Sequence, residues 1–178
     1  MEETLSSKTI YSGRVVKLRV DDVRLPNGRH TKREVVEHSD CVAIVAVDAD
    51  DNVLLVKQFR KPVEKELLEI PAGCIEPGEE PVATVSREMR EETGYLPKSV
   101  KGMGGFYSTP GFCTEYLHLY LAYDLVPDRL YASDTESIEL VRVPSNQIAG
   151  LITSGSICDA KSIAGLLLYL SSRKPTKS

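Results

Sequence analysis

The sequence predicts an α/β fold in which a mixed β-sheet carries helices on its faces. The expected elements follow the order strands, helix, strands, helices, which is typical of such layered folds. Residues 41–47 and 53–59 are almost continuously apolar, which indicates strands buried on both faces. With 178 residues, of which 42% are hydrophobic and 27% charged, the chain is long enough for one well-buried core.

The first elements are predicted to form an antiparallel hairpin. Residues 15–25 alternate between apolar and polar side chains as a strand does. Residues 26–28, Pro-Asn-Gly, have the composition of a hairpin turn, and residues 31–38 form the returning strand. We therefore expect residues 1–40 to form an N-terminal hairpin region.

The centre of the sheet follows this hairpin. A turn at residues 48–52 joins the two apolar strands, and residues 66–71 lead into a glycine loop. Three further strands are expected, at residues 98–106, 116–123 and 137–143.

A central helix is predicted to begin near Pro81 and to end at Gly94. Proline suits the first helical turn because the N–H that it lacks would be unpaired there, and glycine readily adopts the left-handed conformation that ends a helix. The apolar stripe of this helix is expected to consist of Val82, Val85 and Met89.

Two helices are expected at the end of the chain. The first follows Pro144, and the second covers residues 159–170. Residues 173–178 are polar and basic and are expected to form a disordered tail. The apolar face of the second helix is predicted to comprise Ile163, Leu166, Leu167 and Leu170.

Carboxylates gather on one flank of the central helix. Glu88, Glu91 and Glu92 lie within one turn of each other, so they share one side of the helix and repel one another. Arg87, one turn before Glu91, would relieve only part of that repulsion. Residues 87–92 alone are better explained as a solvated helix face with ion pairs. A divalent cation would relieve the remaining repulsion, and an all-oxygen set of ligands selects a hard ion such as Mg²⁺.

Composition and charge argue against several classes of protein. The net charge of −4 and the pI near 5.5 argue against a nucleic-acid-binding surface. The four cysteines form no C-x-x-C pair and there are three histidines, so neither a zinc site nor a disulfide framework is indicated. The sequence has no signal-peptide pattern and no apolar run of roughly 20 residues. We expect a soluble cytoplasmic protein that does not bind membranes.

The segment from the glycine loop through the central helix resembles the Nudix box, G-x5-E-x7-R-E-U-x-E-E-x-G-U, where U is a bulky apolar residue. The matching positions are Gly73, Glu79, Arg87, Glu88, Met89, Glu91, Glu92, Gly94 and Tyr95. Only Tyr95 departs from the aliphatic residue that is usual in the family. The resemblance implies a Nudix α/β/α sandwich, here residues 41–172, that hydrolyses nucleoside diphosphate derivatives.

The resemblance also implies the metal ligands. In the family, the helix glutamates, here Glu88, Glu91 and Glu92, and the carbonyl of the residue before the first glycine, here Ala72, hold magnesium, with manganese as an alternative. Glu88 and Glu92 are therefore expected to be essential for catalysis. Arg87 is expected to organise these glutamates by pairing with them, and contact with a phosphate of the substrate is the alternative.

The glycine loop admits two explanations. Backbone N–H groups near Gly73 and the helix start could cradle anionic oxygen. Tight turns at Gly73 and Gly78 are the simpler alternative. Glu79 also has two possible roles. Family usage places it near the active site, but a glutamate before a helix also stabilises the helix N-terminus.

Several segments point to a branch of the family. Pro110 lies sixteen residues after Gly94, and this offset, together with residues 56–62, 68–73 and 136–139, resembles the ADP-ribose pyrophosphatase branch, although a Pro-Gly turn alone is ordinary. The resemblance implies that Arg60 contacts the diphosphate or the terminal ribose, since the arginine fork binds phosphate bidentately. A solvated charge at a strand end is the alternative for Arg60. Glu69 and Glu115 match positions near substrate or metal in the branch.

Members of this branch are typically homodimers in which the N-terminal hairpin packs on the other subunit and lends residues to its nucleoside pocket. Arg33, near Lys32 and His38, occupies such a position. Residues 31–38 contain none of the aromatic side chains that stack on the base in relatives, so the preference for adenine is open. The guanidinium of Arg33 can stack on a base, and a hairpin face that is merely solvated is the alternative.

The resulting prediction is magnesium-dependent hydrolysis of ADP-ribose to AMP and ribose 5-phosphate. The alternatives are another nucleoside diphosphate derivative, such as GDP-mannose or a dinucleotide, or a non-catalytic sensor of a nucleotide sugar. The complete set of glutamates speaks against a sensor. Glu136, in an acidic loop, is predicted to orient the attacking water, with Glu115 as the next candidate and a solvated loop as the plain alternative.

Overall fold

The structure is a computed structural model that describes residues 1–132 and 137–173. The chain divides into two compact units. The N-terminal unit comprises Met1–Asp40 and Tyr107–Tyr116, and the α/β unit comprises Cys41–Phe106 and the chain from Leu117 onward.

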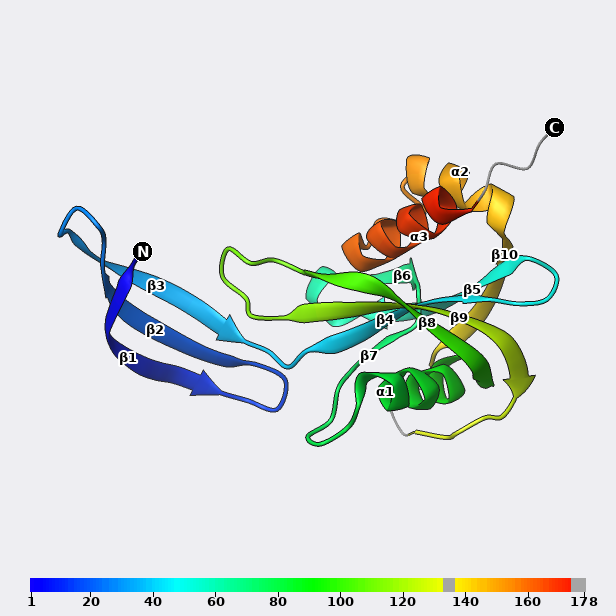
Figure 1. Ribbon diagram of the computed structural model, residues 1–178, viewed down its shortest axis with the longest axis horizontal. Coiled ribbons are helices and arrows are strands. Elements are labelled where there is room, and N and C mark those ends of the chain that lie inside the picture. The colour runs from blue at the N-terminus through cyan, green and yellow to red at the C-terminus, as the bar shows by residue number, and fades with distance from the viewer. Residues whose placement is uncertain (133–136, 174–178) are drawn as a thin grey trace. The chain divides into compact units, whose positions relative to one another are not determined.

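The N-terminal unit is a three-stranded antiparallel sheet. Its strands are β1 (Glu3–Ser12), β2 (Lys17–Arg24) and β3 (His30–Glu37), in the order β1-β2-β3 (Figure 1). The predicted hairpin corresponds to β2 and β3, and the prediction missed β1. All residues of β1 are exposed, so its sequence lacks the apolar alternation that identifies a half-buried strand.

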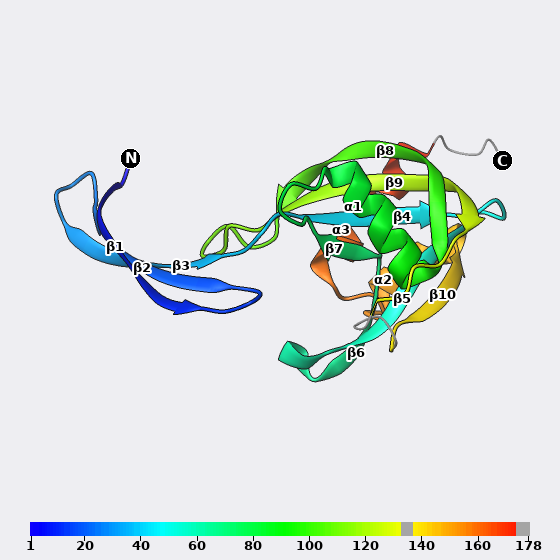
Figure 2. The ribbon, with the colours of Figure 1, turned by 90° about the horizontal axis from the view of Figure 1, so that it is seen from below.

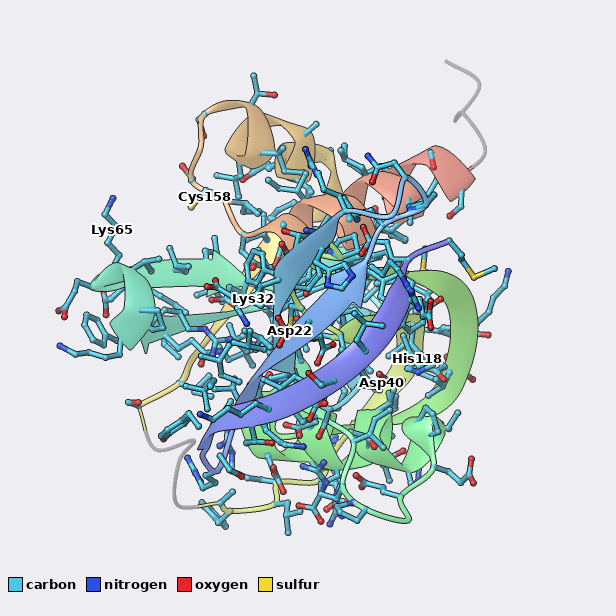
Figure 3. The ribbon with its side chains drawn as sticks, turned by 90° about the vertical axis from the view of Figure 1, so that its left-hand side faces the viewer. Asp22, Lys32, Asp40, Lys65, His118 and Cys158 are labelled. Carbon is cyan, nitrogen blue, oxygen red and sulfur yellow. The ribbon has the colours of Figure 1, made fainter. Side chains whose placement is uncertain are left out.

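Backbone and charge pairing hold this sheet together. Gly28 has a φ of 79° in the β2–β3 turn, and its N–H donates to the carbonyl of Leu25 at 2.9 Å. Asp22 and Lys32 are directly opposite on β2 and β3, and Lys32 Nζ lies 2.7 Å from Asp22 Oδ1 (Figure 3). Val23 and Asp21 are the only described residues of this unit that are fully buried.

A seven-stranded mixed sheet forms the centre of the α/β unit. Its order is β10-β5-β4-β9-β8, with β6 paired to β5 and β7 paired to β4 (Figure 2). The β4–β9 pair is parallel, whereas β5 and β7 run antiparallel to β4. The strands are β4 (Cys41–Val47), β5 (Asn52–Arg60), β6 (Lys65–Glu69), β7 (Ala72–Cys74), β8 (Tyr95–Tyr107), β9 (Tyr116–Pro127) and β10 (Glu139–Pro144).

Helices cover both faces of this sheet, as the sequence predicts. Helix α1 (Pro81–Glu88) lies on one face, and α2 (Ile148–Thr153) and α3 (Ala160–Ser172) lie on the other (Figure 1). Alternate residues of β4 belong to two separate apolar clusters, one with Val85 of α1 and the other with Leu166 of α3. Strand β4 is therefore buried on both sides.

Two details of the predicted helix faces were wrong. Val82 is 50% exposed, and the buried residues of α1 are Thr84, Val85 and Glu88. Leu167 is 48% exposed, whereas Ser162, Gly165, Leu166 and Tyr169 are the buried residues of α3. These four residues have the spacing of one helix face, but two of them are small or polar and gave no apolar signal.

None of the helices in the described part of the chain has the length and the apolar character that crossing a bilayer would require.

Candidate active site

The carboxylate helix begins and ends where the sequence predicts. Pro81 occupies the first turn of α1, and Gly94 ends the helical segment in the left-handed conformation with a φ of 81°. The last turn, Met89–Thr93, is a π-helix, a variation that is frequent at functional sites. Met89 packs into the apolar cluster under β4, which fixes the helix against the sheet.

Two of the predicted ligands, Glu88 and Glu92, are carried inward on this helix. Glu88 is 8% exposed and Glu92 is 6% exposed. The backbone N–H of Ala72 donates to Glu92 Oε2 at 3.0 Å, so the helix carboxylate reaches the strand that the sequence analysis assigns to the metal site. Glu91 is also largely covered, with 13% of its side chain exposed.

Gly73 lies against Glu88. A Cβ atom at this position would stand 1.9 Å from Cδ and Oε1 of Glu88, a distance at which no side chain fits. Gly73 belongs to β7 and pairs with Val42, so the tight-turn alternative does not apply to it. Gly78, with a φ of 83°, does occupy a turn. The glycine thus permits a glutamate to approach the backbone of β7.

Arg87 connects the carboxylates to one another. Its Nε and Nη2 atoms each lie 3.0 Å from a carboxylate oxygen of Glu79, and its Nη1 lies 2.6 Å from Glu88 Oε1 and 3.4 Å from Glu91 Oε2. The Arg87 hydrogen bonds lower the pKa of Glu79 to about 2. Glu79 therefore pairs with Arg87, and it accepts a hydrogen bond from the N–H of Glu76 at 3.2 Å.

Burial raises the pKa values of the two inward-facing glutamates. Burial raises the pKa of Glu88 to about 7, with the charge of Arg87 opposing the shift. Burial, and next the charge of Glu88, raise the pKa of Glu92 to about 8. Both groups therefore keep a proton to a higher pH than an ordinary glutamate does, and a divalent cation would replace the protons. The carboxylate oxygens and the Ala72 carbonyl form an all-oxygen donor set that suits a hard cation.

A second ionic cluster lies next to these glutamates. Arg60 donates from Nε and Nη2 to the two carboxylate oxygens of Glu69, both at 2.8 Å, and Glu69 is 1% exposed. The charges of Glu92 and Arg60 influence each other. Neither prediction for Arg60 anticipated this buried partner.

Sequence reasoning missed two members of this cluster. Lys161 Nζ donates to Glu69 and, at 2.9 Å, to Asp159 Oδ2. Lys161 is separated from Glu69 by 92 residues, and no spacing rule connects positions that far apart. The one available signal was the position of Asp159 before a helix, where it caps α3 by accepting from the N–H of Ser162 at 3.0 Å.

The remaining substrate residues of the sequence analysis lie in the N-terminal unit. Arg33 binds the carboxylate of Glu2 with Nε at 3.1 Å and Nη2 at 2.6 Å. Pro110 and Arg33 line one cavity of about 270 Å³. Glu115 Oε1 lies 3.5 Å from His38 Nδ1. Arg33 and Pro110 thus line the same cavity, whereas Glu115 lies beside His38.

The same cavity contains an aromatic side chain that the sequence analysis did not consider. Phe112 lines it and is 55% exposed. The loop that carries Phe112 runs along β3, because Val36 N–H donates to the Phe112 carbonyl at 2.7 Å and Thr114 N–H donates to the Val36 carbonyl at 3.0 Å. Phe112 lies outside residues 31–38, where relatives carry their aromatic partner for the base. Glu136 lies outside the described residues.

Comparison with known proteins decides the family. The model of the NUDIX domain matches residues 37–165, and the model of the nucleoside diphosphate sugar hydrolase N-terminal domain matches residues 2–36. The chain belongs to the Nudix family. It is a Nudix hydrolase, and Nudix hydrolases generally need a divalent metal ion.

Curated relatives are similar over most of this Nudix chain. An ADP-ribose pyrophosphatase of Bacillus subtilis (strain 168) is 42% identical over 162 residues, which are 90% of this chain and 88% of the relative. A methanol dehydrogenase activator of Bacillus methanolicus is 41% identical over 91% of this chain and 89% of its own length. The crystal structure of an ADP compounds hydrolase has the same fold, with a TM-score of 0.88, 22% identity, and coverage of 96% of this chain and 92% of that one.

Proposed function

We propose that this Nudix hydrolase uses magnesium to cleave the diphosphate of ADP-ribose into AMP and ribose 5-phosphate. The observation that carries the proposal is the pair of buried glutamates, Glu88 and Glu92, held against the backbone of Ala72 and Gly73. The name of the Bacillus subtilis relative supports the choice of ADP-ribose.

The proposed metal ligands are Glu88, Glu91, Glu92 and the carbonyl of Ala72. When bound, the cation neutralises charge on the phosphoryl oxygens and lowers the pKa of a water molecule. Arg87 keeps the glutamates in place through its bonds to Glu79, Glu88 and Glu91. The protein's part is thus to hold oxygen ligands in a fixed arrangement before the substrate arrives.

Arg60 is proposed to bind the diphosphate. Two of its nitrogen atoms are bonded to Glu69, yet 40% of its side chain is exposed. Its Nη1 makes no hydrogen bond to any residue that the structure describes. An anchored guanidinium with an unused N–H group is suited to a phosphate oxygen.

Arg33 and Phe112 are proposed to bind the nucleobase. Both line one cavity with Pro110, and the exposed ring of Phe112 supplies the stacking surface that residues 31–38 lack. Glu2 fixes the guanidinium plane of Arg33, which lowers the entropic cost of stacking on it.

Glu136 remains the proposed water-orienting residue, and Glu115 is the next candidate. Glu136→Gln should lower kcat by roughly 10²- to 10⁴-fold while substrate still binds, since this is the usual range for losing a general base. A decrease of less than about threefold would remove Glu136 from the mechanism.

A panel of substrates tests the proposed activity. ADP-ribose, GDP-mannose and a dinucleotide are incubated with the protein and Mg²⁺, and the released phosphate esters are separated and identified. We expect the highest kcat/KM for ADP-ribose, with AMP and ribose 5-phosphate as products. A higher value for GDP-mannose would favour that alternative substrate, and binding without cleavage would indicate a sensor.

A further inference from the structure

Four charged side chains of alternating sign form a chain beside the glutamate cluster. Asp159, Lys161, Glu69 and Arg60 are joined in this order by hydrogen bonds, with 2.9 Å between Lys161 and Asp159 and 2.8 Å for both Arg60 bonds to Glu69. Only 13% of the Lys161 side chain and 1% of the Glu69 side chain are exposed. Such burial of charges is costly unless every one of them is paired.

The chain of charges is also attached to the segment between β6 and β7, which leads to the proposed metal ligand Ala72. Ser162 follows Lys161, and its Oγ accepts a hydrogen bond of 2.8 Å from the buried N–H of Ile70. Ile70 follows Glu69 directly and precedes Ala72 by two positions. The first residues of α3 therefore form hydrogen bonds both to the side chain of Glu69 and to the backbone of the next residue.

The positive charge of Lys161 is not needed to neutralise Glu69. The bidentate bond from Arg60 already supplies one full positive charge to this carboxylate. Although burial would raise the pKa of Glu69, the bonds from Arg60 and the charge of Lys161 hold its pKa below the ordinary value. Lys161, as a second cation on Glu69 Oε2, holds the carboxylate in one orientation. It also takes up part of the negative charge of Glu69, so that Arg60 is less fully neutralised and can still attract an anion.

We propose that Lys161 is a positioning residue for the diphosphate of the substrate. It fixes Glu69, and Glu69 in turn fixes the plane of the Arg60 guanidinium, whose Nη1 group then faces a constant direction. The proposal rests on the proposed function, because it presumes that Arg60 binds a diphosphate. It predicts that Lys161 affects substrate affinity more than metal binding or turnover.

Lys161→Met tests this role, and Lys161→Arg and Lys101→Met serve as comparisons. We expect Lys161→Met to raise KM for ADP-ribose about tenfold or more, the range for losing an outer partner of a binding group. The value of kcat and the Mg²⁺ concentration for half-maximal rate should stay within about twofold. Lys161→Arg should recover most of the loss, and Lys101→Met, at an exposed lysine of β8, should have no effect.

Asp159→Asn distinguishes positioning from a general effect of charge. The amide still accepts the capping hydrogen bond of α3 but withdraws the charged anchor of Lys161. Positioning predicts a KM about threefold higher, whereas attraction of the anionic substrate by net charge predicts a lower KM. A lower or unchanged KM would overturn the proposal, and this variant decides the question if Lys161→Met does not fold.

Calorimetric titration of ADP-ribose without metal separates this proposal from the proposed function. If the wild-type protein binds ADP-ribose but cleaves none, the proposed function fails while Lys161→Met should still weaken binding about tenfold. If the wild-type protein cleaves ADP-ribose and Lys161→Met changes neither the dissociation constant nor KM, the positioning role is wrong.

Discussion

Gly73 and Glu88 show how closely single residues are fitted at this site. The carboxyl group of Glu88 occupies the space that a Cβ at residue 73 would need. The helix can bring its glutamate to the backbone of β7 only because residue 73 is a glycine. The sequence suggested a turn at this glycine, but its role in the structure is to leave space for the Glu88 carboxylate.

Gly73→Ala should therefore impair catalysis more than folding. The new methyl group forces the Glu88 carboxylate away from its position, so we expect kcat for ADP-ribose to fall by at least about 10- to 100-fold. Gly102→Ala on β8, where the nearest atom is 4.0 Å away, is the matched control and should leave kcat unchanged. Equal activity of the two variants would contradict the assigned position of Glu88.

The buried glutamates also predict how stability depends on pH. The pKa values of Glu88 and Glu92 are raised to about 7 and about 8, so their contribution to stability is present below the ordinary pKa and is lost as pH rises through these values. The melting temperature of the metal-free protein should fall by several degrees between about pH 5 and pH 8. Thermal unfolding at both pH values measures it.

Glu92→Gln is the control for this pH dependence. The amide does not ionise, so the variant should lose much less stability over the same range than the wild-type protein does. Adding Mg²⁺ at the higher pH should restore the melting temperature of the wild-type protein, because the cation stabilises the ionised glutamates. An identical pH dependence in both proteins would show that other groups cause it.

At the scale of elements, helix α3 combines two tasks. Its N-terminal residues hold Glu69 and Ile70, and its buried face packs on the sheet through small residues. Gly165 is central to that face, since a Cβ there would meet Leu119 Cδ1 at 2.9 Å and Ile70 Cδ1 at 3.0 Å. The helix lies close to the sheet because this residue has no side chain.

Two glycine substitutions in helices should have opposite effects on stability. Gly150→Ala in α2 meets nothing within 4 Å, so it should gain about 0.5–1 kcal/mol from helix propensity. Gly165→Ala gains the same propensity but overpacks the core, at a cost of about 1–3 kcal/mol. We expect denaturant unfolding to show a net loss for Gly165→Ala. A stabilising Gly165→Ala would mean that Leu119 and Ile70 yield easily.

Much of the element order could be predicted from the sequence, because apolar runs and helix boundaries are local signals. The strands β4 and β5 and the Pro81 and Gly94 ends of the carboxylate helix were correct for this reason. Strand β1 was missed because an exposed strand pairs through its backbone and needs no pattern. Lys161 and Phe112 were missed because their partners are brought near by folding, which no spacing within the sequence reveals.

At the scale of the whole molecule, the N-terminal unit has very few buried side chains. Only Val23 and Asp21 are fully buried among its described residues, while Leu5, Ile10 and Tyr11 of β1 are each more than 40% exposed. A small sheet with so little buried apolar surface is marginal unless it packs on something. A second copy of the chain would supply that surface, which agrees with the homodimer that the sequence predicts.

Sedimentation equilibrium tests the expected homodimer. We predict a dimer at micromolar concentration, and we predict that Ile10→Lys shifts the equilibrium toward monomer because a charge on β1 would have to be desolvated. Leu168→Lys, at a residue of α3 that is 47% exposed, is the control and should remain dimeric. A fully active wild-type monomer would contradict both the dimer and a shared nucleoside pocket.

The central claim is that Glu88 and Glu92 hold a divalent cation that hydrolysis of ADP-ribose requires. The most direct measurement is the rate of AMP release as Mg²⁺ is added to the wild-type protein, Glu88→Gln, Glu92→Gln and the exposed control Glu66→Gln. We predict that both site variants fold normally but lose more than the roughly 100-fold that an outer-shell change costs, and that Glu66→Gln behaves as the wild type. Near-normal magnesium-dependent turnover in either site variant would contradict the claim.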